Sequence, residues 1–594
     1  MRRLYSVDAS GAPLRPRCEP GHMISMRMRN RVLAGVVLAL MTAGCGDRVG
    51  EEEVLPRAPL TGTGEPAPER GGTAVLAELH DLEMPMPIVY QADLDSDLVD
   101  IMYMGLTRLA WREGRLAHLL SDESPMAIAW RWEYTGADSS AMRFRMRSAL
   151  RWSDGKPLTA RDVVWTYRTI RDSRAASPRQ EDIQIVDSVQ AENDSTVVFH
   201  FRRRSPDMLS AASIPIAPEH SFAGTPPAQL RTHPTLADPT RLVVSGPFRV
   251  GAWRPNAQVT LAPNPHFAPK PLLDAIAIRI VPEPTTRLVE LQTGRVDFVR
   301  PVSTDMLGEL KRRLPTLRFE REQRRFWEFV AYNPRTVEAF RDPNVRRALG
   351  MALDVPAIVQ GLRLEPFVAV ASGPYPPIFR DLYDPARMRP LAFDTTRARA
   401  LLAAAGWRDA DGDGVVEKDG KPLRFTLLTN SGNQRRADVS QVIQQQWRRI
   451  GVDAQLQKLE FTAVQEKQYS KQYEAILGGW GVNLSPDLTG IFGAEAQLNI
   501  VSFDDPEAQR LMAQAKEQPT AQLANPLWRA AAARIVELQP YSFLYYYDPV
   551  TAVSDRLRGV RIDTYGAYQN SWEWWIPRAR QGASAAPDTA TRAP

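Results

Sequence analysis

The stretch RMRSALRWSDGKPLTARDVVWTYRTI, residues 145–170, decides the fold of this chain. Its Ser153-Asp154-Gly155 is a turn signal, because glycine tolerates a positive φ and an aspartate side chain caps turns. Thr159 stands at a helix N-cap position, with Asp162 three residues later as in a capping box. The apolar residues that follow recur on one helical face: Val163, Tyr167 and Ile170. The stretch therefore predicts an extended segment, a turn and a capped helix.

As a string of residues, this stretch resembles the signature of the family 5 extracellular solute-binding proteins, which are oligopeptide, dipeptide and nickel receptors of ABC importers. The matching positions are Trp152-Ser153-Asp154-Gly155, Pro157, Thr159-Ala160, Asp162-Val163-Val164 and Thr166-Tyr167. Weaker strings extend the resemblance over nearly all of residues 73–577. It implies an α/β chain with the two-lobed periplasmic-binding-protein fold (class II, the large peptide-receptor type), which has mixed sheets and an interlobe cleft.

The composition is that of an ordinary globular protein without a strong charge bias. The chain has 594 residues, enough for two or three lobes, with 44% hydrophobic and 24% charged residues. Its 74 basic and 69 acidic side chains leave a formal charge of only +5, and no dense block of lysine or arginine accompanies it. We therefore expect no nucleic-acid partner.

The N-terminal region predicts a lipoprotein signal peptide. Three arginines precede the apolar run Val32–Met41, which is about half the ~20 residues that a spanning helix needs. Thr42-Ala43-Gly44-Cys45 then resembles a bacterial lipobox, which implies a lipid on Cys45. The alternative is an ordinary signal peptide that contains a cysteine. If the lipobox is used, Cys18 is removed and the mature chain has neither a free thiol nor a disulfide.

The chain is expected to divide into six segments. The upstream segment and signal peptide occupy residues 1–44, and a Glu-, Pro- and Gly-rich flexible tether occupies 45–72. The lobes are expected at 73–325 (lobe I, with an inserted subdomain), 326–540 (lobe II) and 541–578 (return to lobe I), followed by a disordered tail at 579–594. The hinge is expected near Arg325–Asn333 and Pro540–Tyr547.

Residues 394–459 support an α/β fold independently of the family. Strand patterns at Leu423–Thr429 and Val452–Leu459 flank a helix pattern at Ala437–Ile450, which Gly451 closes. Short connections between strand, helix and strand predict a βαβ crossover and a parallel strand pair.

An acidic turn precedes these elements. Asp409, Asp411, Asp413 and Gly414 have the spacing of an EF-hand loop, but its twelfth position is Gly420, where a bidentate glutamate is needed. We favour a solvated turn over a calcium site, and we expect no metal and no cofactor.

Two function classes have to be compared, an enzyme and a receptor. The sequence contains no H-E-x-x-H, G-x-S-x-G or Walker A string, and its seven histidines are scattered. The resemblance implies a receptor that is not an enzyme, binds a peptide-like or other small solute, and delivers it to an ABC permease while anchored to the membrane in the cell envelope. We expect a monomer. The alternative is a tethered sensor or chaperone without a transporter.

The resemblance also suggests ligand contacts. Peptide-binding relatives carry a W-x-x-D string whose aspartate pairs with the peptide's α-ammonium, and here Trp480 is followed three residues later by Asn483. An amide brings no charge, so peptides with free N-termini should not be preferred. Asp487 or Glu495 could supply the missing charge, and Asn483 could instead only stabilise its loop. The predicted ligand-binding residues are Met84, Gly479, Trp480, Gly481, Asn483 and Asp487.

Overall fold

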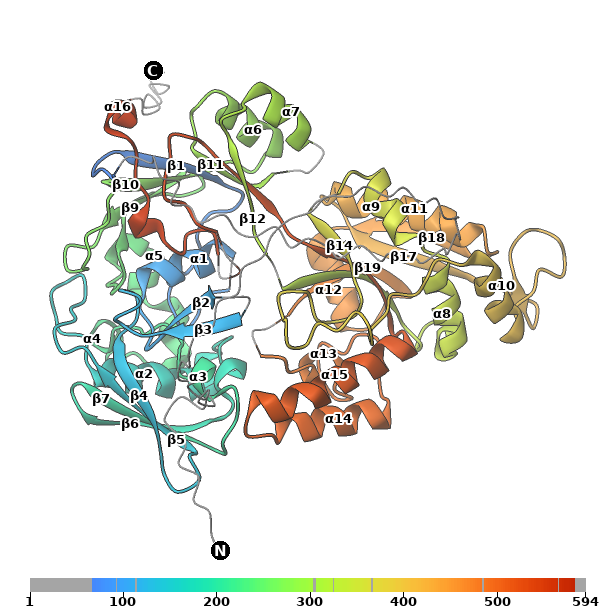
Figure 1. Ribbon diagram of the computed structural model, residues 1–594, viewed down its shortest axis with the longest axis horizontal. Helices are drawn as coiled ribbons and strands as arrows, with labels where there is room; N and C mark the ends of the chain where they lie inside the picture. The colour runs from blue at the N-terminus through green and yellow to red at the C-terminus, as the bar shows by residue number, and fades with distance from the viewer. Residues whose placement is uncertain are drawn as a thin grey trace, which may run out of the picture. The chain divides into compact units, whose positions relative to one another are not determined.

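A computed structural model describes residues 67–582 of the protein except 92, 113–114, 303–305, 324, 365–366, 483–484, 563 and 565. The expected signal peptide, Cys45, most of the tether and Asn483 lie outside the described residues. The last part of the expected tail, 583–594, lies outside them too, whereas Arg578–Gln581 form the short helix α16. Two large sheets organise the described chain (Figure 1).

The first large sheet has seven strands in the order β12-β21-β11-β1-β10-β9-β8. Its central strand β1 runs parallel to β10 and β11, and the other pairs are antiparallel. The strands are β1 (Thr73–Glu78), β8 (Phe248–Arg254), β9 (Gln258–Pro263), β10 (Ala275–Ile280), β11 (Phe298–Val302), β12 (Arg318–Arg321) and β21 (Val550–Val553). Helices α6 (Pro284–Gln292) and α7 (Leu307–Arg313) pack against this sheet through Leu288, Leu291 and Leu310.

A smaller four-stranded sheet is inserted between β1 and β8. Its order is β4-β5-β7-β6, with β4 (Ala129–Thr135), β5 (Ala141–Met146), β6 (Val186–Asn193) and β7 (Thr196–Phe201). Helix α2 (Ala160–Arg171) follows β5, and Thr159 and Asp162 form the reciprocal capping box that the sequence predicts. The predicted turn is also confirmed, since Gly155 has φ +87°. A hairpin of β2 (Arg108–Arg112) and β3 (Arg115–Leu119) completes the strands of this region.

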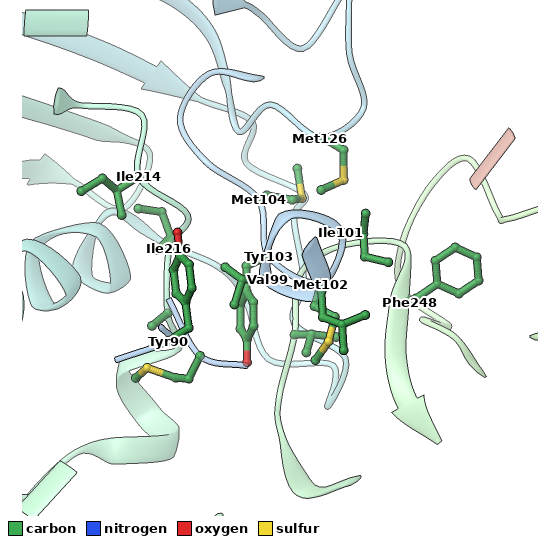
Figure 2. Close-up of a cluster of buried hydrophobic side chains, with 14 of the residues drawn as sticks. Tyr90, Val99, Ile101, Met102, Tyr103, Met104, Met126, Ile214, Ile216 and Phe248 are labelled. Carbon is green, nitrogen blue, oxygen red and sulfur yellow. The ribbon is translucent and has the colours of Figure 1, made fainter. Parts of the chain in front are cut away.

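The core of this half of the molecule surrounds helix α1 (Asp93–Met102). Figure 2 shows Val99, Ile101 and Met102 of α1 among side chains from distant segments, which include Met126, Ile214 and Phe248. All of these side chains are almost completely buried. The four-stranded sheet and the seven-stranded sheet therefore share one hydrophobic core.

The second large sheet has six strands in the order β14-β20-β13-β19-β17-β18. The predicted βαβ crossover is confirmed, because β17 (Arg424–Asn430) pairs in parallel with β18 (Asp453–Leu459) across helix α11 (Gln434–Arg448). Helix α12 (Phe461–Tyr469) then leads to β19 (Ala475–Gly481), which is parallel to β17. The remaining strands are β13 (Phe326–Tyr332), β14 (Val368–Val370) and β20 (Tyr541–Tyr547).

Helices cover both faces of the second sheet. One face packs on α8 (Pro343–Met351), α9 (Val355–Gly361), α10 (Thr395–Ala404) and α11. The other packs on α12, α13 (Thr489–Phe492), α14 (Pro506–Lys516) and α15 (Ala521–Leu538). Within the described part of the chain, no helix combines the length and the apolar character that crossing a membrane requires.

The chain passes between the two large sheets twice. The first passage joins β12 to β13 through residues 322–325, and the second joins β20 to β21 through Asp548 and Pro549. The sequence places the return to lobe I at residue 541, but β20 still pairs with β13 in the second sheet. The segments expected as the hinge, Arg325–Asn333 and Pro540–Tyr547, therefore coincide with strands β13 and β20. The two passages lie next to these strands. The aromatic-rich run Tyr541–Tyr547 fits either sheet, so its composition alone does not locate this boundary.

Candidate functional site

Both passages leave the second sheet at the same edge. Strands β17 and β19 end there, and β13, which is antiparallel to β19, begins there: Phe326 pairs with Gly481 and Trp327 with Tyr546. In the first sheet, β1 and β11 end at the edge where β21 begins, because Val302 pairs with Val550. Carboxyl ends of parallel strands are where α/β proteins place their ligands. These two edges, which the passages join, are the candidate binding surfaces.

A pocket of about 170 Å³ lies at this edge of the second sheet. Helix α12 forms one wall, and the end of β19 with Phe326 and Arg436 forms the other (Figure 1 shows α12 beside β19). The residues that line it are Phe326, Asn430, Arg436, Phe461, Val464, Gln465, Gln468, Tyr469 and Ile476 to Trp480. A second hollow of about 480 Å³, lined by Arg70, Arg147 and Trp572 among others, lies away from both edges.

A buried charge cluster supports the pocket. Glu328 on β13 has 0% of its side chain exposed and binds Arg435 (2.8 Å) and Arg436 (3.2 Å) in the first turn of α11. Burial alone would raise the pKa of Glu328, but the two guanidinium groups outweigh it and hold that pKa below its ordinary value. Arg435 also donates to the hydroxyl of Tyr545 (2.9 Å) and stacks on Tyr547, 4.2 Å from the ring centroid.

The loop that follows β1 lies at the corresponding edge of the first sheet. The carboxylate of Asp95, which is buried, accepts the backbone N–H groups of Glu83 (2.9 Å) and Met84 (2.7 Å) and so fixes this loop. Burial raises the pKa of Asp95 to about 6, although those two N–H groups act in the opposite direction.

A second buried charge cluster lies at the end of β1. Arg300 on β11 donates to Glu78 (2.9 Å) and also binds Asp97 of α1, while the hydroxyl of Tyr568 donates to Glu78. Burial raises the pKa of Asp97 to about 7; Arg300 opposes this shift, but the nearby carboxylates of Glu78 and Glu322 add to it. This cluster joins strands β1 and β11, helix α1 and the C-terminal segment that carries Tyr568 at the candidate edge of the first sheet.

The residues predicted to bind the ligand lie in different environments. Gly479 and Trp480 line the pocket, but the Trp480 indole N–H donates inward to Tyr541 (3.3 Å), so its ring forms a wall and is only 8% exposed. Gly481 is exposed beside Phe326, with open space where a Cβ would be.

Two more predicted residues have partners of their own. The Asp487 carboxylate accepts from the backbone N–H of Thr489 (2.7 Å) and pairs with Lys516 (3.1 Å). Met84 packs partly buried against the first core, away from the pocket walls. The role of all these residues in binding stays a prediction, as does that of Asn483.

The acidic turn holds itself together with its own backbone. Asp409 accepts from the N–H groups of Gly412 (2.7 Å) and Gly414 (3.1 Å), and Asp413 accepts from that of Val415 (2.7 Å). The carboxylates of Asp409, Asp411 and Asp413 are exposed and gather within 4.8 Å of one another. Exposed carboxylates with local N–H donors are typical of a solvated turn.

Sequence patterns alone do not single out Glu328, Arg435, Arg436 or the pocket-facing side of α12. The sequence contains one signal: two arginines lie in the first turn after the N-cap residue Asn433, in the helix that follows a strand predicted to be parallel. Their partner Glu328 lies more than a hundred residues earlier, and strand alternation alone does not indicate that this glutamate is buried.

Two sheets joined by two passages, with candidate surfaces at the joined edges, define a two-lobed solute-binding protein. The chain belongs to the bacterial extracellular solute-binding proteins, family 5, whose sequence model matches residues 126–494. The oligopeptide-binding protein AppA of Bacillus subtilis is 27% identical over 519 residues, which are 86% of this chain and 93% of AppA.

Solved structures of related proteins have the same fold. The structure of Bacillus subtilis AppA in complex with a nonapeptide is 26% identical, with a TM-score of 0.73 over 86% of this chain and 100% of that one. NikZ from Campylobacter jejuni in complex with Ni(L-His) is 22% identical, with a TM-score of 0.72 over 85% of this chain and 99% of that one. The second likeness concerns the fold alone.

Proposed function

We propose that this chain captures a peptide-like or other small solute between its lobes and delivers it to the permease of an ABC importer. The observation that supports this most directly is the arrangement of the two sheets. Their candidate edges are the edges that both passages join, so a solute held at one edge lies next to the other lobe. Ligand contacts with both lobes would stabilise a closed state, which is a shift of population and needs no chemistry.

The relatives support a peptide-like ligand but do not restrict it to one. AppA is described as oligopeptide-binding, and NikZ of the same fold was solved with a nickel–histidine complex. We further propose that the protein is a monomer in the cell envelope, held to the membrane by a lipid on Cys45, with lobe I at 73–325, lobe II up to the end of β20, and a return to lobe I from Asp548.

The test is to identify what the protein carries. Protein isolated from its own cell envelope under native conditions should release a small solute that mass spectrometry identifies. Calorimetry should show that this solute rebinds to the emptied protein at one site per chain. Loss of uptake of the same solute in cells that lack the protein would connect binding to transport. Binding without any change in uptake would favour the tethered sensor instead.

A further inference from the structure

The pocket between α12 and β19 has a defined volume and one wall that carries exposed aromatic side chains. The wall is one face of α12, formed by residues at helical spacing: Phe461, Val464, Gln465, Gln468 and Tyr469. Val464 is buried, yet Phe461 is 51% and Tyr469 is 39% exposed. Two large side chains at the two ends of one helix face therefore border a hollow that the chain itself leaves open.

The volume of the pocket corresponds to a single ring. An apolar cavity of about 150 Å³ accepts benzene, and this pocket measures about 170 Å³. Its shape depends on Gly479, because a Cβ there would come within 2.1 Å of Cζ of Phe326 and 3.0 Å of Nη2 of Arg436. Glycine at this position thus lets an aromatic ring and a guanidinium group lie directly over the strand.

The polar side of the pocket is positive. Nε of Arg436 donates to Glu328, and Nη1 donates to Oδ1 of Asn430 (2.8 Å). Among the described residues, Nη2 of Arg436 has no hydrogen-bond acceptor, and no acidic residue lines the pocket. Among the residues that the structure describes, Glu328 is the one carboxylate that pairs with both Arg435 and Arg436, so this group of three keeps one positive charge. An acceptor or anion entering the pocket would meet that charge and the unused N–H groups.

We propose that this pocket is a subsite for one aromatic or similarly sized ring of the solute, and that a carboxylate next to the ring binds Nη2 of Arg436. The proposal rests on the proposed function and specifies which part of a solute enters this edge of lobe II. The proposed subsite is formed by residues other than Asn483. It agrees with the prediction that solutes with a free ammonium group are not the preferred ligands.

The experiment is calorimetry on the full chain with three probes: N-acetyl-phenylalanine, its C-terminal amide, and N-acetyl-alanine. The acid with the ring should bind at least about tenfold more tightly than its amide, because a hydrogen bond to a charged group is lost in the amide. N-acetyl-phenylalanine should also bind at least about tenfold more tightly than N-acetyl-alanine, because the alanine side chain leaves the pocket empty.

Two variants and their controls locate these effects. Gln465→Trp should fill the pocket and remove the preference for the ring, whereas Glu466→Trp, on the exposed side of the same helix, should keep it. Arg436→Gln should remove the preference for the acid over the amide, whereas Arg449→Gln, exposed at the far end of α11, should not. Circular dichroism of each variant checks that it is folded.

The proposal is overturned if wild type binds acid and amide equally, if it binds none of the probes at millimolar concentration, or if folded Gln465→Trp keeps the ring preference. These outcomes leave the proposed function intact as long as the native solute still rebinds. Failure of the native solute to rebind would instead count against the proposed function itself.

Discussion

The backbone N–H of Glu322 donates a hydrogen bond of 2.9 Å to the carbonyl oxygen of Pro549. Glu322 lies in the first passage between the sheets and Pro549 in the second, so this bond ties the two passages together where they leave the first sheet. The passages are short, and regular strand pairing begins on each side of them. We therefore expect these two short passages to take up any rotation of one lobe against the other.

Replacement of Glu328 by glutamine should destabilise lobe II. The substitution leaves Arg435 and Arg436 without the buried carboxylate that both of them bind. Removal of one partner from a buried ion pair costs about 3–5 kcal/mol. Urea unfolding should show this loss, and Glu466→Gln, at an exposed position, should change stability by less than ~0.5 kcal/mol. A Glu328→Gln protein as stable as wild type would show that the cluster contributes little.

Stability should depend on pH through Asp97. Its pKa in the folded protein is about 7, against about 3.9 for an unperturbed aspartate, so the folded state holds a proton that the unfolded chain releases. The contribution of this group is therefore complete below about pH 4 and is lost as the pH rises to about 7. One proton gives a slope of at most about 1.4 kcal/mol per pH unit.

Calorimetric melting of wild type and Asp97→Asn between pH 4 and pH 8 measures this effect. The difference between their melting temperatures should change steadily up to about pH 7 and then level off. Two parallel curves over the whole range would mean that Asp97 titrates near its ordinary pKa, with Arg300 dominating its surroundings.

Peptides with a free N-terminus should bind no better than their N-acetylated forms. The family resemblance predicts that Asn483 replaces the aspartate that pairs with the ammonium group in peptide-binding relatives. A buried ammonium without a partner costs on the order of several kcal/mol. Asp487, the nearest alternative, already pairs with Lys516. Calorimetry with paired free and acetylated peptides should show amine preference only in Asn483→Asp. Tight binding by wild type that requires the free amine would refute this prediction.

Cys45→Ser should release the protein from the membrane. Acyl chains on Cys45 would anchor it by burying many CH₂ groups at about 0.8 kcal/mol each. Fractionation should find wild type with the membranes and the variant in the soluble fraction. A soluble wild-type protein whose N-terminus is unmodified and lies elsewhere would contradict the anchor.

The sequence predicted the fold best where one short segment carries the whole signal. Thr159 and Asp162 cap α2, and Gly451 has φ +81° after α11. Each depends on neighbours within a few residues, so pattern and geometry coincide. The same locality explains why the βαβ crossover was predicted to within three residues at each end.

The candidate site was harder to predict because it is built from distant residues. Glu328, Arg435 and Tyr545 belong to three elements separated by about a hundred residues each, and only the strand order of the second sheet brings them together. Strand β20 pairs with β13 of the same sheet, and the sequence of β20 alone does not indicate this partner or the register of the pairing. The residues Gly479 and Trp480 were found through a family string, and the structure adds the pocket around them.

The most direct test of lobe closure around a bound solute is small-angle scattering of the emptied protein, with and without the solute that co-purifies with it. We expect a smaller radius of gyration at saturating solute, because contacts with both lobes favour a closed state. An unchanged radius of gyration, with binding confirmed by calorimetry in the same samples, would contradict closure of the lobes around the solute.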